Sequence, residues 1–239
     1  MNFAKWTPVF ALPLFLGLIG SAAVGQSAPD ANAELSRVVS QMDRTAANFH
    51  TTQANFVWQH YTKVIEDMTD TEKGTIYFRR SGHEVEMAAD VSDPSPPKYV
   101  LFTGNKVEMY QPKIDQVTQY NTGKDRAAFE SFLVLGFGGS GQDMLKSFDV
   151  TYIGNEKIGN VDTVKLNLVP KSDKAHNTFS HIWLWVDPAR GVSLRQQLFE
   201  PDGDYRLADY SDIQLNQKIP DSAFKLKTTS KTKFLSPKG

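Results

Sequence analysis

The sequence predicts an α+β protein dominated by an antiparallel β-sheet, which curls into a half-open barrel with helices as a plug or lid. Ten or so strand-like runs, separated by turn residues, follow one another from Thr75 to Leu226, against about three helical segments. Several runs are apolar on both faces, whereas a sheet with one face in water alternates apolar and polar residues. A sheet of this many strands must curl or split into two.

The segment 179–186 shows the two-sided apolar pattern most clearly. Successive side chains of a strand point to opposite faces of its sheet. Apolar side chains fall on both faces here: Ile182, Leu184 and Val186 on one, and Phe179, Trp183 and Trp185, with His181, on the other. The sheet is therefore expected to enclose something apolar, either its own core or a ligand.

The first 25 residues have the features of a secretory signal peptide. Lys5 precedes the apolar run Val9–Ile19, and the small residues Ala23-Val24-Gly25 suit cleavage before Gln26. The run is too short and wrongly flanked for a membrane span. An uncleaved anchor is the alternative. We therefore expect an exported protein with a single domain over residues 26–239.

Composition excludes several classes of protein. The chain has no cysteine, so it has no lipidation site at a mature N-terminus and must be stabilised by its core. Its net charge of −1 at pH 7 excludes a strongly basic nucleic-acid binder. Charges are scattered without blocks of one sign, which is typical of solvated surfaces. We expect a monomer.

The first expected element is an amphipathic helix over residues 33–49, with Asn32 as its N-cap. Strands follow, and Asp67–Asp70 is expected to be a turn between the first two. The three prolines of Ser92–Pro97 predict a bend. The strands expected in this half are 53–65, 74–80, 83–91, 99–103, 106–111 and 116–120.

Residues 124–148 interrupt the strand pattern. Residues 124–135 look helical, Gly136–Gly141 is a glycine-rich loop, and 142–146 is a short helical turn. Strands then resume, with a tight hairpin predicted at Pro201–Asp204. The strands expected here are 148–153, 163–169, 179–186, 193–200, 205–215 and 224–228.

Motifs for catalysis are absent, so we do not expect an enzyme, a metal or a cofactor. The five histidines have no metal-binding spacing. Gly136–Gly141 matches GxGxxG, but a predicted helix precedes it where a dinucleotide-binding unit needs a strand. Ser140 lacks the second spaced glycine of a nucleophile elbow. Asp202 and Asp204 are better explained by a turn than by calcium.

The remaining candidate function is an apolar cavity. Composition alone favours an ordinary core over a cavity, and periodicity does not separate a sandwich from a half-barrel. The inward-facing candidates are Ile76, Phe78, Val85, Met87, Val107, Met109, Val164, Leu166, Leu168, Ile182 and Leu184.

A set of motifs extends along most of the mature chain. They are Ala47-Asn48-Phe49-His50, Ala54-Asn55-Phe56-Val57-Trp58-Gln59, Gly74-Thr75-Ile76-Tyr77-Phe78-Arg79-Arg80, Asn105 to Pro112 with Gln116-Val117, Leu168-Val169-Pro170-Lys171, Trp185-Val186-Asp187-Pro188 to Gly191, and Asn216 to Phe224. Together these motifs resemble the LolA family of periplasmic outer-membrane lipoprotein carriers.

The resemblance implies a half-barrel of about eleven strands that holds acyl chains. The family's lid-holding arginine falls on Arg80, on the same face as Ile76 and Phe78. Ser81 replaces the proline that usually follows it, so Arg79 also stays a candidate. The other lipid-binding candidates are Phe56 and Trp58 on the first strand and Phe129, Phe132 and Leu133 in the 124–135 helix.

The resemblance also implies partners and competing functions. A carrier takes triacylated lipoproteins or other acylated lipids from an inner-membrane ABC lipoprotein-release complex to an outer-membrane acceptor. The first alternative is an RseB-like sensor that binds an anti-sigma factor. Such sensors have a second, C-terminal domain, which the expected strands leave little room for. The second alternative is a free-lipid shuttle. The face with Trp183 and Trp185 is explained by none of these.

Overall fold

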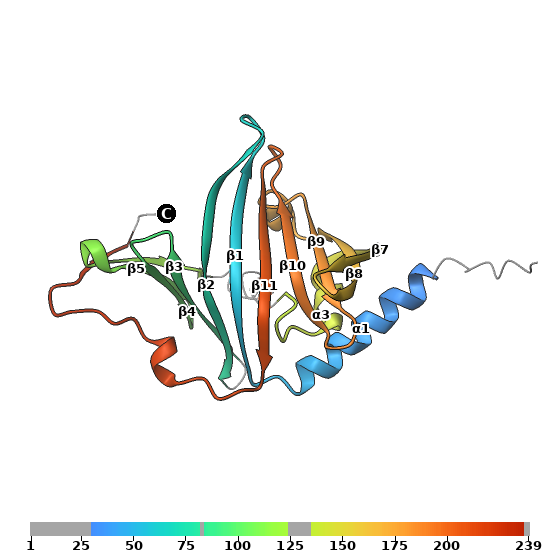
Figure 1. The fold of residues 1–239 in the computed structure, drawn as a ribbon, viewed down its shortest axis with the longest axis horizontal. Coiled ribbons are helices and arrows are strands. Elements are labelled where there is room, and N and C mark those ends of the chain that lie inside the picture. Colours follow the sequence, from blue (N-terminus) through green and yellow to red (C-terminus); the bar gives the residue numbers. More distant parts are fainter. Residues whose placement is uncertain (1–29, 82–83, 124–134, 237–239) are drawn as a thin grey trace, which may run out of the picture.

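The protein is a half-open barrel made from one sheet of twelve strands (Figure 1). The computed structural model describes residues 30–81, 84–123 and 135–236. The strand order is β12-β6-β5-β4-β3-β2-β1-β11-β10-β9-β8-β7, and its two edge strands, β12 and β7, do not pair with each other. The expected fold class is confirmed, with twelve strands in the described residues where about eleven were expected.

Neighbouring strands pair antiparallel, except that β12 pairs parallel to β6. The strands are β1 (Thr51–Thr62), β2 (Asp67–Ser81), β3 (Glu84–Asp93), β4 (Lys98–Thr103), β5 (Lys106–Gln111), β6 (Gln116–Asn121), β7 (Phe148–Ile158), β8 (Val161–Pro170), β9 (His181–Asp187), β10 (Val192–Phe199), β11 (Tyr205–Leu215) and β12 (Lys233–Leu235). The helices are α1 (Ala31–Ala47), α3 (Gly141–Ser147) and α4 (Asp173–His176), with 3-10 turns η1 (Pro112–Ile114) and η3 (Asp221–Phe224).

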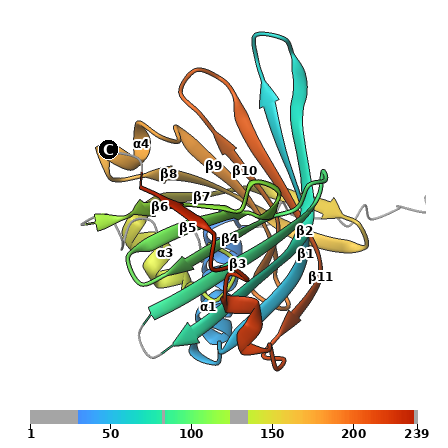
Figure 2. The ribbon, with the colours of Figure 1, turned by 90° about the vertical axis from the view of Figure 1, so that its left-hand side faces the viewer.

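Helix α1 lies on the concave side of the sheet (Figure 2). Its apolar stripe packs on β7, β8 and β9, and the resulting core includes Val38, Val39 and Met42 of α1 with Leu166 and Leu184 of the sheet. The N-cap was expected at Asn32, which was wrong. The carboxylate of Asp30 accepts a hydrogen bond from the Asn32 backbone N–H at 3.0 Å, so the helix begins earlier.

The β1–β2 hairpin turns earlier than expected. The predicted turn at Asp67–Asp70 is wrong, because β2 already begins at Asp67, paired with Thr62. The turn lies at 63–66, where Glu66 adopts φ +55°. Val64 and Ile65 at the tip are 92% and 60% exposed. Since apolar residues occupy the tip, hydrophobicity gave no signal for the chain reversal.

The C-terminal segment crosses the outer face of β2 to β4. The strand expected over 224–228 is wrong: η3 ends at Phe224, and the last strand is β12. Phe224 is buried in a small cluster with Ala88 and Leu101. The Arg79 guanidinium lies 4.2 Å from the Phe224 ring centroid. Phe224 therefore packs as a side chain on the sheet instead of adding a strand to it.

The outer face of β9 carries Trp183 and Trp185 in an aromatic row that continues to Phe199 of β10. The Trp183 and Phe199 rings are 4.7 Å apart. The Lys165 ammonium lies 4.1 Å from the Trp183 ring and 4.4 Å from the Trp185 ring. Trp185 Nε1 donates to Glu156 at 2.9 Å, and this bond lowers the pKa of that carboxyl. Cross-strand stacking of this kind stabilises a sheet and explains the two-sided pattern of β9.

Two expected segments lie outside the described residues. They are the signal peptide over 1–25 and, except for Leu135, the helix over 124–135 with Phe129, Phe132 and Leu133. Among the helices that the structure describes, none has the length and hydropathy needed to cross a bilayer.

Candidate functional site

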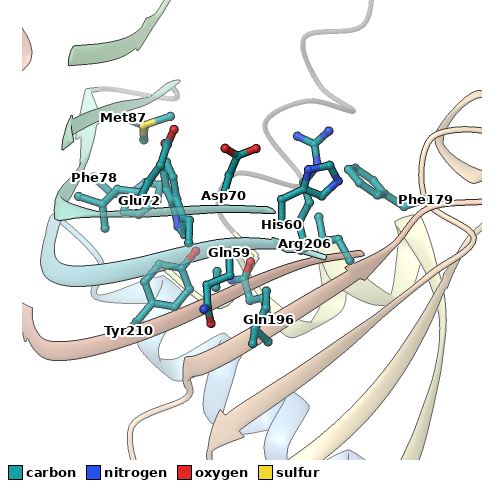
Figure 3. A pocket seen from close by; sticks show the side chains of 15 residues that line it. Gln59, His60, Asp70, Glu72, Phe78, Met87, Phe179, Gln196, Arg206 and Tyr210 are labelled. Carbon is teal, nitrogen blue, oxygen red and sulfur yellow. The ribbon is translucent and has the colours of Figure 1, made fainter. Parts of the chain in front are cut away.

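The concave face holds a cavity of about 610 Å³ (Figure 3). This volume lies within the range of small-molecule pockets, roughly 300–1,000 Å³. The lining comes from β1, β2, β3, β10 and β11 and from the segment before β9. It consists of Trp58, Gln59, His60, Asp70, Glu72, Ile76, Phe78, Met87, Phe179, Gln196, Leu198, Arg206, Leu207, Ala208 and Tyr210.

Ala208, a small residue between two large ones, leaves a hollow in the middle of the concave face. Ala208 of β11 pairs with Trp58 of β1 on one side and with Gln196 of β10 on the other. Since directly paired residues point to the same face of an antiparallel sheet, all three side chains face the cavity. The short Ala208 side chain leaves space that its neighbours border without filling.

One end of the cavity is closed by the loop 136–140, with Phe137 as a plug. The Phe137 ring stacks on Phe78 at 5.3 Å and meets Tyr210 edge-on at 4.6 Å. Gly138 has φ +90°, and a Cβ there would lie 2.5 Å from the Phe49 ring. Glycine is therefore required at this position by both conformation and space. The GxGxxG match reflects this packing of the loop on apolar rings.

Within the described residues, three hydrogen bonds hold the loop and Leu135, the residue before it, to the sheet. Gln196 Nε2 donates to the Leu135 carbonyl at 2.6 Å, and the Ser193 backbone N–H donates to the Gly136 carbonyl at 3.0 Å. Arg80 Nη2 donates to the Gly138 carbonyl at 3.2 Å. Each such bond contributes only about 1 kcal/mol net. The plug is thus held by few polar contacts together with the packing of Phe137.

The alternation of β2 separates Arg79 from Arg80. Arg80 shares the concave face with Phe78 and reaches the loop. Arg79 points to the outer face, where it pairs with Glu86 at 2.6 Å and with Asp221 at 2.6 Å. Of the two candidates, only Arg80 has the geometry of a residue that holds a closing segment.

The opposite end of the cavity carries charged side chains. Glu72 forms an ion pair with Lys98, and Arg206 pairs with Glu200 at 2.7 Å. Asp70, at the exposed rim, has neither an ion pair nor a side-chain hydrogen bond in the part of the chain that the structure describes. The cavity is therefore apolar at its closed end and ionic at the other.

The predicted lipid-binding residues fall into separate groups. Those that line the cavity are Trp58, Ile76, Phe78 and Met87. Those packed in the core around it are Phe56, Val85 and Val107, and those in the core beneath α1 are Val164, Leu166, Leu168, Ile182 and Leu184. Met109 is half-buried on β5. The roles of all these residues in lipid binding stay predictions.

Sequence reasoning missed the lining contributed by β10 and β11. Applying the period of two to these strands would have placed Gln196 with Leu198, and Ala208 with Tyr210, on one face. Phe179 was assigned to the face of Trp183, which is wrong. It precedes β9 and its backbone N–H donates to the Ala175 carbonyl at 2.9 Å, so strand alternation does not apply to it.

Tyr210 gives the site a measurable pH dependence. Burial raises the pKa of its phenol to about 12, while its hydrogen bond with Trp58 acts in the opposite direction. The folded state therefore keeps this proton at pH values where the unfolded chain loses it. The stability contributed by the neutral phenol is complete below pH 10 and is lost as the pH rises towards 12.

We expect Tyr210→Phe to flatten the loss of stability between pH 10 and 12. The pH-dependent difference in the free energy of unfolding between the variant and the wild type should reach about 2 kcal/mol at pH 12. Urea unfolding at a series of pH values measures it. Tyr120→Phe, at an exposed position, is the matched control and should follow the wild type. Identical curves for Tyr210→Phe and wild type would contradict the prediction.

An open antiparallel half-barrel with an apolar cavity on its concave face defines a class of ligand-binding proteins that enclose apolar molecules. The family described as "Outer membrane lipoprotein carrier protein LolA" matches residues 47–227, more than half of the chain. The protein therefore belongs to the LolA family, which confirms the resemblance seen in its motifs.

Solved structures with this fold are distant in sequence. MucB is 12% identical at a TM-score of 0.51, over 81% of this chain and 63% of MucB. An uncharacterized conserved protein from Thermus thermophilus is 10% identical at 0.51, over 86% and 98%. The lipoprotein LppX of Mycobacterium tuberculosis is 11% identical at 0.47, over 80% and 99%. At these identities the likeness to MucB and to the Thermus thermophilus protein shows the fold alone. No curated protein matched the sequence.

Proposed function

We propose that this protein is a periplasmic carrier that shields the acyl chains of lipoproteins in its cavity and moves them from the inner to the outer membrane. The apolar cavity of about 610 Å³ on the concave face is the observation that supports this function. Each methylene removed from water is worth about 0.8 kcal/mol, so acyl chains need such a shield to cross the periplasm. The carrier performs no catalysis.

The plug suits a carrier because it can open. Phe137 occupies apolar space that continues from the cavity past Phe78. Breaking the three hydrogen bonds of the loop requires only a few kcal/mol, which the burial of a few methylenes offsets. An acyl chain of the arriving cargo thus replaces the Phe137 ring as the packing partner of Phe78. After release, the Phe137 ring packs on Phe78 again.

The partners in this proposal come from the family. Cargo is loaded by an inner-membrane ABC lipoprotein-release complex and delivered to an outer-membrane acceptor. The signal peptide expected over residues 1–25 is consistent with export to the periplasm. In this role the protein acts as a chaperone in outer-membrane biogenesis.

Native mass spectrometry after gentle purification from the periplasm tests the carrier function. A co-purifying triacylated lipoprotein is the expected result. A free glycerolipid would favour a lipid shuttle with the same cavity. Protein without any lipid, purified under conditions that retain other weakly bound ligands, would contradict both functions.

A sensor is the second candidate, favoured by the structural likeness to MucB. This chain spans 63% of MucB, and another solved structure contains MucB together with MucA. A sensor of this class would bind a segment of an anti-sigma factor. Tight binding of such a segment, unaffected by mutations in the cavity, would favour the sensor over the carrier.

We expect Arg80→Leu to impair cargo cycling more than folding. The variant loses one hydrogen bond to the Gly138 carbonyl, so the free energy of unfolding should change by only about 1 kcal/mol. Loading and release should change clearly, because the loop loses its hydrogen bond to β2 and keeps only the two bonds to β10 and the packing of Phe137. Transfer of a labelled lipoprotein between donor and acceptor vesicles measures the cycle.

Arg79→Leu is the matched control for this experiment. It removes the outer-face ion pairs with Glu86 and Asp221 and the contact with Phe224. Its stability should fall by about 1 kcal/mol while transfer stays normal. Normal transfer by Arg80→Leu would count against the proposed role of Arg80 in holding the glycine-rich loop.

A further inference from the structure

We propose that the cavity selects amphiphiles whose headgroup carries a primary amine, and that Asp70 and His60 recognise this group. The inference rests on the proposed binding of acyl chains and adds the chemistry of the headgroup. The cavity defines the site, and its polar end determines which headgroup fits there.

The cavity has a polarity that orients an amphiphile. Its apolar end is closed by Phe137 on Phe78, and its other end is lined by His60, Asp70 and Arg206 (Figure 3). A chain inserted towards Phe137 would leave its headgroup among these charged side chains. The reverse orientation would bury a headgroup against aromatic rings, which is unfavourable for a polar group.

His60 and Asp70 are neighbours at the polar end, and neither side chain accepts a hydrogen bond from a residue that the structure describes. They are directly opposite each other in the β1–β2 register, so their side chains share the concave face. Nε2 of His60 is buried without a hydrogen-bond partner there, and the carboxylate of Asp204 is 3.7 Å away. Asp70 has no partner among the same residues. A primary ammonium can donate to the Asp70 carboxylate and to an imidazole nitrogen that carries no proton, which an anionic headgroup cannot.

Two cations next to this site, those of Arg206 and Lys98, are already paired. Arg206 is held by Glu200 at 2.7 Å, and Lys98 is held by Glu72. An anionic headgroup would therefore have to displace a carboxylate from either of these two cations before it gained a contact with it. An amine needs no such exchange at Asp70, because none of the described residues pairs with that carboxylate.

The charge around the mouth of the cavity also favours a cationic headgroup over an anionic one. Residues 60–72 and 199–206, which form the adjacent ends of two hairpins, contain seven carboxylates and two basic residues, while the whole chain has a net charge of only −1. The hairpins are joined by the Lys63 backbone N–H, which donates to Asp204 at 2.9 Å. A local excess of carboxylates attracts cations and repels anions over about a Debye length, roughly 10 Å at 0.1 M salt.

Three probes of equal chain length test the proposal: dodecylamine, dodecanol and dodecanoate. They are titrated calorimetrically below the micelle concentrations of the two charged probes and below the solubility limit of dodecanol. Dodecylamine should bind about threefold tighter than dodecanol, and dodecanoate should bind weakest. The difference should shrink in about 1 M salt. Asp70→Asn should reduce dodecylamine affinity about threefold while leaving dodecanol binding unchanged.

Two further variants separate the site from general effects. His60→Leu should also reduce the preference for the amine, whereas Asp162→Asn, at an exposed position of β8 remote from the cavity lining, should not. Equal affinity for all three probes, or an equal effect of Asp70→Asn on all three, would overturn the headgroup proposal and leave the carrier function intact. Failure of every probe to bind would overturn the proposed function as well.

Discussion

Replacing Ala208 with tryptophan is expected to abolish acyl-chain binding while the protein still folds. Ala208 lies between Trp58 and Gln196 on the concave face, so an indole at this position would fill the middle of the cavity. Excluding only about four methylenes of a chain would lose ~3 kcal/mol, which is about a hundredfold in affinity. The indole enters existing space, so the penalty of overpacking a filled core is avoided.

Calorimetric titration with dodecanol and thermal unfolding together measure this result. Ala33→Trp is the matched control, because Ala33 is exposed on α1 and away from the cavity lining. It should bind the probe like the wild type. Unchanged binding by a folded Ala208→Trp variant would show that the chain lies outside this cavity.

Leu184→Ala is expected to have the largest effect on stability and little effect on binding. Leu184 is fully buried in the core between β9 and α1, away from the cavity lining. Truncating a buried leucine removes apolar contacts and leaves a void, which costs about 2–5 kcal/mol. Urea unfolding measures the loss of stability, and titration with dodecanol measures binding.

Leu198→Ala provides the contrast. Leu198 lines the cavity and is only partly buried, so its truncation should cost less stability and weaken binding of the probe. The two variants decide which part of the predicted lining is core and which is ligand surface. Weakened probe binding by Leu184→Ala, measured on folded protein, would place the ligand beneath α1 instead.

Side-chain periodicity predicted most of the strands because alternation is a local property of an extended chain. The bounds of β5 and β11 agree with those expected, and Ile76 and Phe78 face inwards as predicted. Errors arose where a contact distant in sequence decided the local structure. Phe224 packs on Tyr77 across the outer face, and the sequence around it has the pattern of a strand.

The lining of the cavity was harder to predict than the fold. Period two identifies the apolar face of a strand, and it does not show what covers that face. Leu184 and Phe78 have the same pattern in the sequence, but α1 covers Leu184, while Phe78 borders open space next to Phe137. Polar lining residues such as Gln196 carry no hydrophobic signal at all.

The sequence by itself determined the class of fold, the family and the inward face of β2, because these depend on composition, motifs and alternation along the chain. Only the tertiary structure decided that Arg80 rather than Arg79 holds the glycine-rich loop, since the choice depends on what lies across each face of the sheet. It also decided where the cavity lies. A cavity is the space left between elements after packing, and packing depends on contacts between residues far apart in the chain.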